Sequence, residues 1–400
     1  KINNLPITQF YAIDIDNLLP ERIYGGTQDN GTVRTTTGAT NDWQNILGGD
    51  GMYCLVDYKN SDRIFAEAQW GSLYRSLNGG NYFTWIAGYF YSDRKNWMAP
   101  YVMHPNNPDT MYFGTYRIWK TLDGGDQWTA VSGDLTEGDD GSTYHTITTI
   151  DISPVNPDII VAGTDDGRLH VSTDAGINWT AAYNGLPDRW ITRVAADPFK
   201  DSTIYVTVSG FRWDEPLSHV YRSTDLGTTW ADISSGLPEI PMNCIALDPL
   251  FQDRIFVGSD AGVFLSDNGG QSWMSLSQGM PNVAVISLKI HNNNRKIVAG
   301  TYGCSTFTLD LDSLLTNLSI SGTVSYKNLP ETPLDNTKII VRDSLANIID
   351  STRSTVNGYY SFFNISPGNY KINAKSEKIW GGGNSTDALF VKKRTVHLIN

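Results

Sequence analysis

The sequence of 400 residues is poor in cysteine and in charge, and it has no long apolar run. Cysteine occurs only at Cys54, Cys244 and Cys304, and this odd number excludes a complete disulfide framework. Cys54 and Cys244 stand in apolar segments, so we predict buried free thiols there. Without a run of about 18 apolar residues, no transmembrane helix is predicted.

Basic residues are also scarce relative to acidic ones. Lys and Arg number 30 against 42 Asp and Glu, which gives a net charge of −12. Because nucleic acid is a polyanion, this balance argues against nucleic-acid binding. The six histidines show no metal-binding spacing, and no phosphate loop or nucleophile elbow is present, so neither a metal nor a cofactor is predicted. The 12 Trp and 20 Tyr instead favour strands and ligands such as sugars or peptides.

One short apolar segment recurs seven times. Its anchor residues are Ile23, Ile64, Met111, Ile160, Ile204, Ile255 and Ile297. A strand and a turn rich in Asn, Pro and Asp precede each anchor, and two further strands follow most of them. Four antiparallel strands in each of seven units predict a seven-bladed β-propeller over residues 1–311. The last unit lacks a fourth strand, and we expect residues 1–9 to supply it and close blade seven.

The turn between the third and fourth strands carries the most specific motif. It reads TLDGGDQW, STDAGINW, STDLGTTW and SDNGGQSW, with the motif residues Asp123, Trp128, Asp174, Trp179, Asp225, Trp230, Asn268 and Trp273. An Asp at this position can accept hydrogen bonds from backbone N–H groups of its own turn, and the glycine permits a positive φ. We therefore interpret these side chains as structural, not catalytic.

This pattern resembles the Asp-box, or BNR, repeat of sialidases, sortilin-type receptors, xyloglucan-hydrolysing glycosidases and photosystem assembly factors. The resemblance covers residues 1–311 and implies that the boxes lie on the outer rim. The ligand face would then be formed by the loops between second and third strands and by the connections between blades. Its candidate residues are Gln28, Asp29, Asp50, Trp70, Tyr116, Arg117, Asp165, Asp166, Arg168, Trp190, Trp213, Asp214 and Tyr302. Aromatic planes beside carboxylates favour a glycan, and a protein partner remains open.

An enzyme is the alternative interpretation of this face. The segment YGGTQD, residues 24–29, is similar to a first-blade turn of xyloglucan-hydrolysing enzymes but one residue longer, and the similarity implies a catalytic role for Asp29, alone or with Asp50. Those enzymes are inverting hydrolases that use one Asp from each of two facing propellers, whereas one propeller is predicted here. A sialidase would need an arginine triad, and the spacing of Arg117, Arg168 and Arg189 does not indicate one.

The pattern changes after Leu311. Residues 312–317 are predicted to be a linker, and short strands over 318–377 predict a small β-sandwich. This segment resembles the transthyretin-like modules of the carboxypeptidase-regulatory and Cna-B type. Residues 378–400 are similar to half of a dockerin repeat, which implies a short C-terminal helix over NSTDALFVKKR. The Asp residues of a dockerin calcium loop are replaced, so calcium is left open at this tail.

Together these features predict an extracellular or cell-surface protein of bacterial origin. Its start reads as the interior of a strand pattern, so we expect it to be processed or truncated. The propeller would bind a glycan or an extracellular protein, and the C-terminal modules would serve attachment or assembly. The alternatives are a fragment of a xyloglucanase-like glycoside hydrolase and a structural subunit of an extracellular polymer.

Overall fold

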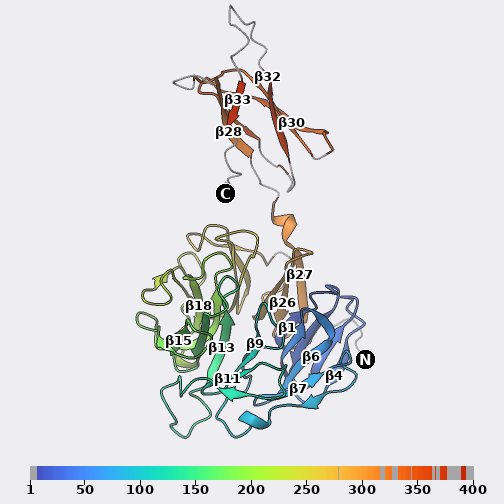
Figure 1. The fold of residues 1–400 in the computed structure, drawn as a ribbon, viewed down its shortest axis with the longest axis vertical. Helices are drawn as coiled ribbons and strands as arrows, with labels where there is room; N and C mark the ends of the chain where they lie inside the picture. Colours follow the sequence, from blue (N-terminus) through green and yellow to red (C-terminus); the bar gives the residue numbers. More distant parts are fainter. Residues whose placement is uncertain are drawn as a thin grey trace, which may run out of the picture. The chain divides into compact units, whose positions relative to one another are not determined.

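The chain folds into two compact units, Lys1–Leu309 and Asp310–Asn400. The computed structural model describes residues 7–277, 279–315, 320–326, 332–343, 345–362, 365, 370–375 and 389–392. The first unit contains seven antiparallel sheets that follow one another in chain order around a ring (Figure 1). The seven blades predicted from the sequence repeat are thus confirmed. No helix among the described residues is long and apolar enough to cross a membrane.

Six of the blades have four strands, in sequence order from the inside outward. Their strands are β1 (Phe10–Ile15), β2 (Ile23–Thr27), β3 (Gly31–Thr35) and β4 (Gln44–Leu47); β5 (Gly51–Asp57), β6 (Asn60–Ala68), β7 (Ser72–Ser76) and β8 (Thr84–Trp85); β9 (Tyr101–Met103), β10 (Met111–Gly114), β11 (Ile118–Thr121) and β12 (Thr129–Ala130); β13 (Ile147–Ile152), β14 (Ile160–Thr164), β15 (Leu169–Ser172) and β16 (Thr180–Ala181); β17 (Trp190–Ala196), β18 (Ile204–Ser209), β19 (His219–Ser223) and β20 (Ala231–Asp232); β21 (Met242–Leu247), β22 (Ile255–Ser259), β23 (Gly262–Ser266) and β24 (Met274–Ser275). Among the described residues, blade seven has three strands: β25 (Val285–His291), β26 (Lys296–Thr301) and β27 (Thr306–Asp310). Three short 3₁₀ helices are η1 (Gly88–Phe90), η2 (Phe211–Trp213) and η3 (Leu311–Leu315).

Neighbouring blades pack closely because the second strand places a buried apolar anchor and a glycine at fixed positions. All seven anchors are at most 7% exposed. At Gly163, an added Cβ would lie 2.6 Å from Cγ2 of Ile191 in the next blade. At Gly300, it would lie 2.8 Å from Cγ2 of Ile13. The absence of a side chain at these positions lets each blade approach the next one.

The box turns join the third and fourth strands, and their polar side chains are used inside the turn. Asp174 accepts hydrogen bonds from Ser172 Oγ at 2.9 Å and from Asn178 N at 2.8 Å. These hydrogen bonds, that from the Asn178 backbone first, lower the pKa of Asp174. The same pattern, an acceptor oxygen bonded to a hydroxyl two residues before it and a backbone N–H four residues after it, recurs at Asp123, Asp225 and Asn268. The tryptophans of two boxes also reach the preceding blade: Trp230 and Trp273 donate to its backbone carbonyls.

The first and last blades meet and close the ring. The backbone N–H of Ile13 in β1 donates to Ser287 Oγ in β25 at 3.3 Å. Residues 1–9 were expected to add the fourth strand of blade seven. Their described part, residues 7–9, contacts the loop between β26 and β27, where Ser305 N donates to the Thr8 carbonyl at 3.1 Å and Gln9 bridges Tyr302. Residues 1–6 lie outside the described residues.

The described part of the second unit forms two three-stranded antiparallel sheets with a shared core. One has the order β31 (Tyr359–Phe362), β28 (Ile320–Tyr326), β33 (Leu389–Lys392), and the other has the order β30 (Ile348–Arg353), β29 (Lys338–Arg342), β32 (Lys371–Lys375). Val324 and Tyr360 of the first sheet pack in one buried cluster with Ile339 and Val341 of the second. This arrangement confirms a β-sandwich after the propeller.

The predicted C-terminal helix is wrong over its described part. Leu389–Lys392 form strand β33, which pairs antiparallel with β28. A short apolar run such as LFV fits a helix or a strand, and the free edge of β28 decides in favour of the strand. The segment therefore contributes to the sandwich. The other residues of the dockerin-like tail, and with them the calcium question, lie outside the described residues.

Candidate functional site

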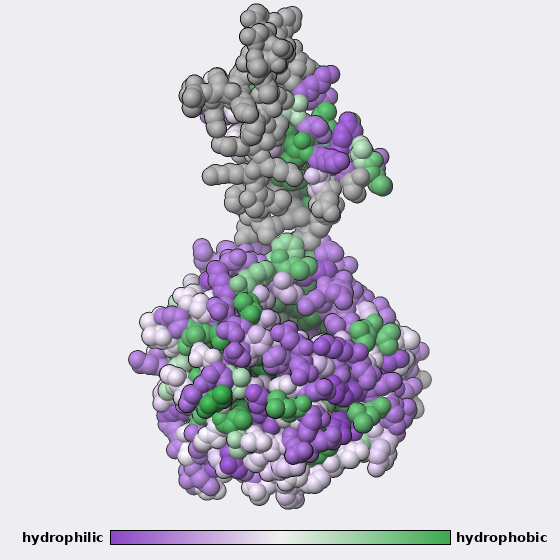
Figure 2. Space-filling view, in the orientation of Figure 1, coloured by the Kyte–Doolittle hydropathy of each residue, from purple (hydrophilic) through white to green (hydrophobic). Residues whose placement is uncertain are grey.

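The loops between second and third strands emerge at the same end of the sheets as the connections between blades. The predicted ligand-face residues occupy these segments of blades one to five and seven. The box turns and the first hairpins lie at the other end. In the view of Figure 2, the propeller surface is mainly hydrophilic, with apolar residues scattered over it.

Four residues from blades one, two and seven form what we call the acidic–aromatic cluster: Gln28, Asp29, Asp50 and Tyr302. The Asp29 backbone N–H donates to Asp50 Oδ1 at 2.5 Å, and the Tyr302 hydroxyl donates to Gln28 Oε1 at 2.8 Å. Asp29 is exposed and has a left-handed backbone, with φ 61°. Its carboxylate makes no hydrogen bond or ion pair with any described residue. The cluster therefore presents an open carboxylate beside an exposed ring.

A cavity of about 700 Å³ adjoins this cluster along blade two. Gln69 Nε2 donates to Asp50 Oδ2 at 3.1 Å and links the cavity wall to the cluster. The rings of Trp70 and Trp97 meet edge to face, with centroids 5.0 Å apart, and Trp70 is 44% exposed. Trp70 also has a positive φ of 58°, and its N–H donates to the Trp97 carbonyl at 3.0 Å. The strained backbone thus holds a large ring at the cavity edge.

On blade three, Tyr116 and Arg117 belong to a network around Asp93. Arg117 binds Asp93 through Nε at 2.9 Å and Nη2 at 3.0 Å. Burial favours the neutral form of Asp93, but the hydrogen bonds from Arg117 and its neighbours outweigh it and lower the pKa of that carboxyl. The Arg94 and Arg117 guanidinium groups lie 5.0 and 5.1 Å from the Tyr116 ring. The Arg117 guanidinium is therefore already paired with the Asp93 carboxylate inside the protein.

On blade four, the side chain of Asp165 is buried. This residue is 1% exposed, and it accepts hydrogen bonds from Thr146 N at 2.8 Å and Thr146 Oγ1 at 2.7 Å. Burial raises the pKa of Asp165. Asp166 accepts from the Glu137 backbone N–H at 2.8 Å, and Arg168 forms an ion pair with Glu137. These contacts hold the acidic loop of residues 133–146, which connects blades three and four, against the loop between β14 and β15.

On blade five, Trp190 and Trp213 flank an exposed arginine. The Arg212 guanidinium lies 5.7 Å from the Trp190 ring centroid and 5.4 Å from that of Trp213. Asp214 ends η2 with a left-handed φ of 52°. Trp213 is 41% exposed, so this group offers a second aromatic surface on the same face.

Some residues of the face were not singled out from the sequence. Trp97 lies in a loop whose aromatic content was visible, but its pairing with Trp70 was not. Tyr11 stands in an ordinary strand pattern, and its hydroxyl donates to Gln28 Oε1 at 3.3 Å. Burial raises the pKa of Tyr11, which keeps this donor protonated.

One group of described residues has the composition of a metal site. Ligand atoms of Glu137, His145 and Asp166 lie within 4.8 Å of one another. Each of the three already has an oppositely charged or ionisable neighbour within the protein: Glu137 pairs with Arg168, and His145 Nδ1 lies 2.9 Å from Asp166 Oδ2. We therefore assign no metal function to this group.

Comparisons with known proteins connect both units to characterised folds. A family model described as the second β-sandwich domain of the NOMO1-like BOS complex subunit matches residues 316–399. A xyloglucanase of Hypocrea jecorina is 29% identical over 141 residues, which are 31% of this chain and 17% of that protein. The aligned part is thus a minor portion of the xyloglucanase.

Solved structures resemble the chain over a greater length. The GH74 enzyme of Niastella koreensis has a TM-score of 0.61 at 18% identity, covering 94% of this chain and 67% of its own. YCF48 from Cyanidioschyzon merolae has a TM-score of 0.57 at 14% identity, covering 76% of this chain and 96% of its own. In two further GH74 structures, the chain covers 56% and 61% of the whole. These likenesses show the fold: a β-propeller of the kind found in GH74 enzymes and YCF48, followed by a β-sandwich.

Proposed function

We propose that this protein is an extracellular glycan-binding module, with the glycan lying across the acidic–aromatic cluster and the cavity beside Trp70. The observation that carries the proposal is the exposed Trp70 ring on a cavity whose wall residue Gln69 bonds to Asp50, the partner of the Asp29 N–H. Sugar rings stack on aromatic planes through their C–H faces, while their hydroxyls need polar partners of this kind. The likeness to a xyloglucanase supports a β-glucan of the xyloglucan type as the ligand.

Calorimetry with xyloglucan oligosaccharides tests the proposal. Trp70→Ala is expected to weaken binding at least tenfold, because stacking area is lost at the cavity edge. Trp85 offers a matched control, since it is also 44% exposed but lies on the outer strand β8. Equal binding by the native protein and Trp70→Ala would refute the assignment of this face. YCF48 has been solved bound to D1 peptide, so a peptide array serves as a second arm for a protein partner.

A glycoside hydrolase is the second candidate, favoured by the xyloglucanase relative and by the free carboxylate of Asp29. An inverting hydrolase needs a second carboxyl group roughly 6.5–9.5 Å away across the bond to be cleaved. Asp50 lies beside Asp29, but it is bonded to the Asp29 N–H and to Gln69. We therefore propose glycan binding as the first candidate function of this chain and hydrolysis as the second.

Release of reducing ends from xyloglucan separates the two candidates. Turnover by the native protein that disappears in Asp29→Asn, and persists in the exposed control Asp201→Asn, would establish the hydrolase. Binding without turnover in all three proteins would support the module. The β-sandwich of residues 318–377, with β33, would serve attachment to a cell surface or a larger assembly. Labelling of intact cells with an antibody against this unit tests that location.

A further inference from the structure

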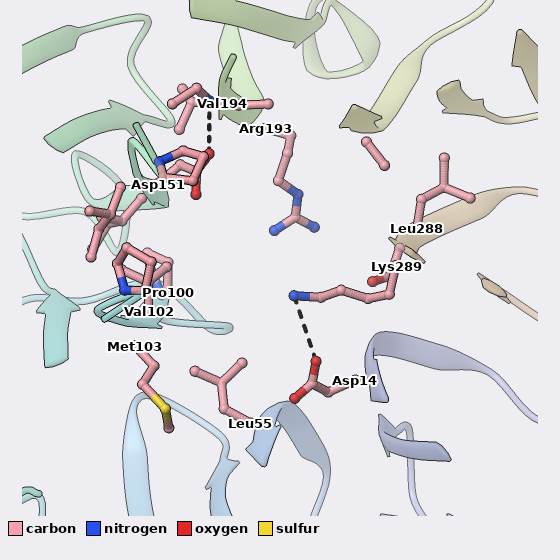
Figure 3. A pocket seen from close by; sticks show the side chains of 18 of the residues that line it. Asp14, Leu55, Pro100, Val102, Met103, Asp151, Arg193, Val194, Leu288 and Lys289 are labelled. Atoms are coloured by element: carbon pink, nitrogen blue, oxygen red, sulfur yellow. Dashed lines mark hydrogen bonds and ion pairs between the residues drawn. The ribbon is translucent and has the colours of Figure 1, made fainter. Parts of the chain in front are cut away.

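The centre of the propeller encloses a cavity of about 520 Å³, separate from the glycan face. The first strand of every blade contributes to its wall. Asp14, Asp151 and Lys289 stand at equivalent places, because each pairs with the residue that follows the anchor of its second strand. They therefore share one layer of the channel. Arg193 enters from β17 one layer nearer the glycan face (Figure 3).

The two carboxylates of this layer are engaged by the backbone of the next blade. Val56 N–H donates to Asp14 Oδ2 at 2.9 Å, and Ala196 N–H donates to Asp151 Oδ2 at 2.8 Å. Each carboxylate thus joins two blades. Lys289 Nζ lies 3.8 Å from Asp14 Oδ1, which is a long ion pair.

The two cations point into the cavity from different blades. Figure 3 shows the Arg193 guanidinium and the Lys289 ammonium converging on the middle of the channel. Arg193 donates to the Tyr53 hydroxyl and, at 3.5 Å, to the Ile286 carbonyl. A guanidinium has five N–H donors and an ammonium three, so both groups keep donors directed at the cavity. No described carboxylate lies within ion-pair distance of Arg193.

We propose that this channel binds a small anion of the oxyanion or carboxylate class between Arg193 and Lys289. A planar guanidinium fork from blade five and an ammonium point charge from blade seven, directed into one cavity, form an arrangement that recognises such groups. The cavity extends to the turns that follow the first strands, where Asn17, Tyr58, Pro105, Pro154 and Pro198 line it. The anion would therefore enter from the side opposite the glycan face, and its binding does not depend on the proposed glycan function.

The charges that face the channel make this binding depend on pH. They are Asp14, Asp151, Arg193 and Lys289, which cancel when all are ionised. The phenol groups of Tyr53, Tyr58 and Tyr101 also line the channel. Burial raises the pKa of Asp151 to about 6 and also raises that of Asp14. Protonation of Asp151 below this pKa leaves the channel with a net positive charge. Anion binding is therefore coupled to proton uptake.

Calorimetry with sulfate tests the site, because sulfate stays a dianion between about pH 5 and pH 8. Ionic strength is held constant with chloride, and formate provides a carboxylate arm. We expect one saturable site at about pH 5 and at least tenfold weaker binding at about pH 7.5. Saturation by sulfate alone would assign an oxyanion site, and saturation by formate alone a carboxylate site. The absence of saturable binding of either anion at about pH 5 would overturn the proposal.

Two variants locate the site in the channel. Lys289→Met is expected to abolish binding, whereas Lys371→Met, on the β-sandwich, leaves it unchanged. Asp151→Asn keeps an acceptor for Ala196 N–H and fixes the neutral state, so binding should depend on pH much less than in the native protein. Unchanged sulfate affinity in Lys289→Met would overturn the proposal. A circular dichroism spectrum of each variant establishes that the propeller is folded.

Discussion

The indole N–H of Trp230, in the box of blade five, donates to the carbonyl of Ala182, in blade four, at 2.8 Å. The equivalent indole of Trp179 donates instead to Gly176 of its own turn at 3.0 Å. The same motif therefore has two uses, since one tryptophan closes its turn and the other ties two blades together. Trp273 follows the second pattern, with the Ile233 carbonyl as its acceptor.

Replacing Trp230 by Phe should lower the free energy of unfolding by about 1–2 kcal/mol, because the hydrogen bond between the blades and part of the packed ring are lost. Urea unfolding followed by tryptophan fluorescence measures this change. Trp85→Phe is the control, since Trp85 is 44% exposed and lies on an outer strand. A loss of the same size in both variants would show that the contact with Ala182 contributes nothing.

Gly163→Ala should destabilise the propeller by about 1–3 kcal/mol, because the added methyl group would overlap Ile191 of the next blade. Its Cβ would lie 2.6 Å from Ile191 Cγ2, and Ile191 is fully buried. Gly133→Ala serves as the matched change, since nothing lies within 4 Å of a Cβ there. Thermal unfolding compares the two. Equal melting temperatures would mean that neighbouring blades separate at little cost.

The buried ion pair between Asp248 and Arg295 should be sensitive to loss of one partner. Arg295 Nη1 and Nη2 each lie 2.8 Å from an Asp248 oxygen, and the pair links blades six and seven. Asp248→Asn is expected to cost about 3–5 kcal/mol, because it removes the buried negative charge that faces both Arg295 and Arg254. Glu21→Gln removes the exposed pair with Lys296, 3.7 Å apart, and should change stability by less than about 1 kcal/mol. Chemical denaturation distinguishes these outcomes.

Protonation of Asp151 should increase the free energy of unfolding as the pH falls from about 7.5 to about 5. Burial raises the pKa of Asp151 from 3.8 to about 6, so the folded protein binds the proton more tightly than the unfolded chain. The stabilisation is complete below the ordinary pKa and is lost as the pH rises through about 6. Asp151→Asn should therefore stabilise the protein at about pH 7.5 by at most about 3 kcal/mol and flatten the pH profile. The exposed control Asp201→Asn should retain the native profile, and a native slope in Asp151→Asn would contradict the prediction.

The sequence predicted most of the propeller because the repeat is local. Each anchor, such as Ile160 or Ile255, is followed by its own turn chemistry, so period and turn residues agree within about fifty residues. The thiols of Cys54 and Cys244 are buried, as their apolar strands predicted. The segment around Leu389 was misread because its conformation depends on β28, which lies far away in sequence.

The candidate site was predictable as a set of loops but not as a set of contacts. Asp165 and Asp29 look alike in sequence, yet Thr146 draws Asp165 inward while Asp29 stays exposed. The contact between Arg193 and Tyr53 joins residues 140 positions apart. Such contacts form only when the ring is closed, so they cannot be predicted from a local sequence pattern.

The closure between Ile13 and Ser287 joins residues 274 positions apart, which has a consequence for biosynthesis. The ribosome completes blade one long before it produces β25. Until then, the face of blade one that packs against blade seven is uncovered. A nascent propeller therefore exposes two apolar sheet faces, one on blade one and one on the blade made last. Chains released before residue 301 should therefore be more prone to aggregate than the complete protein.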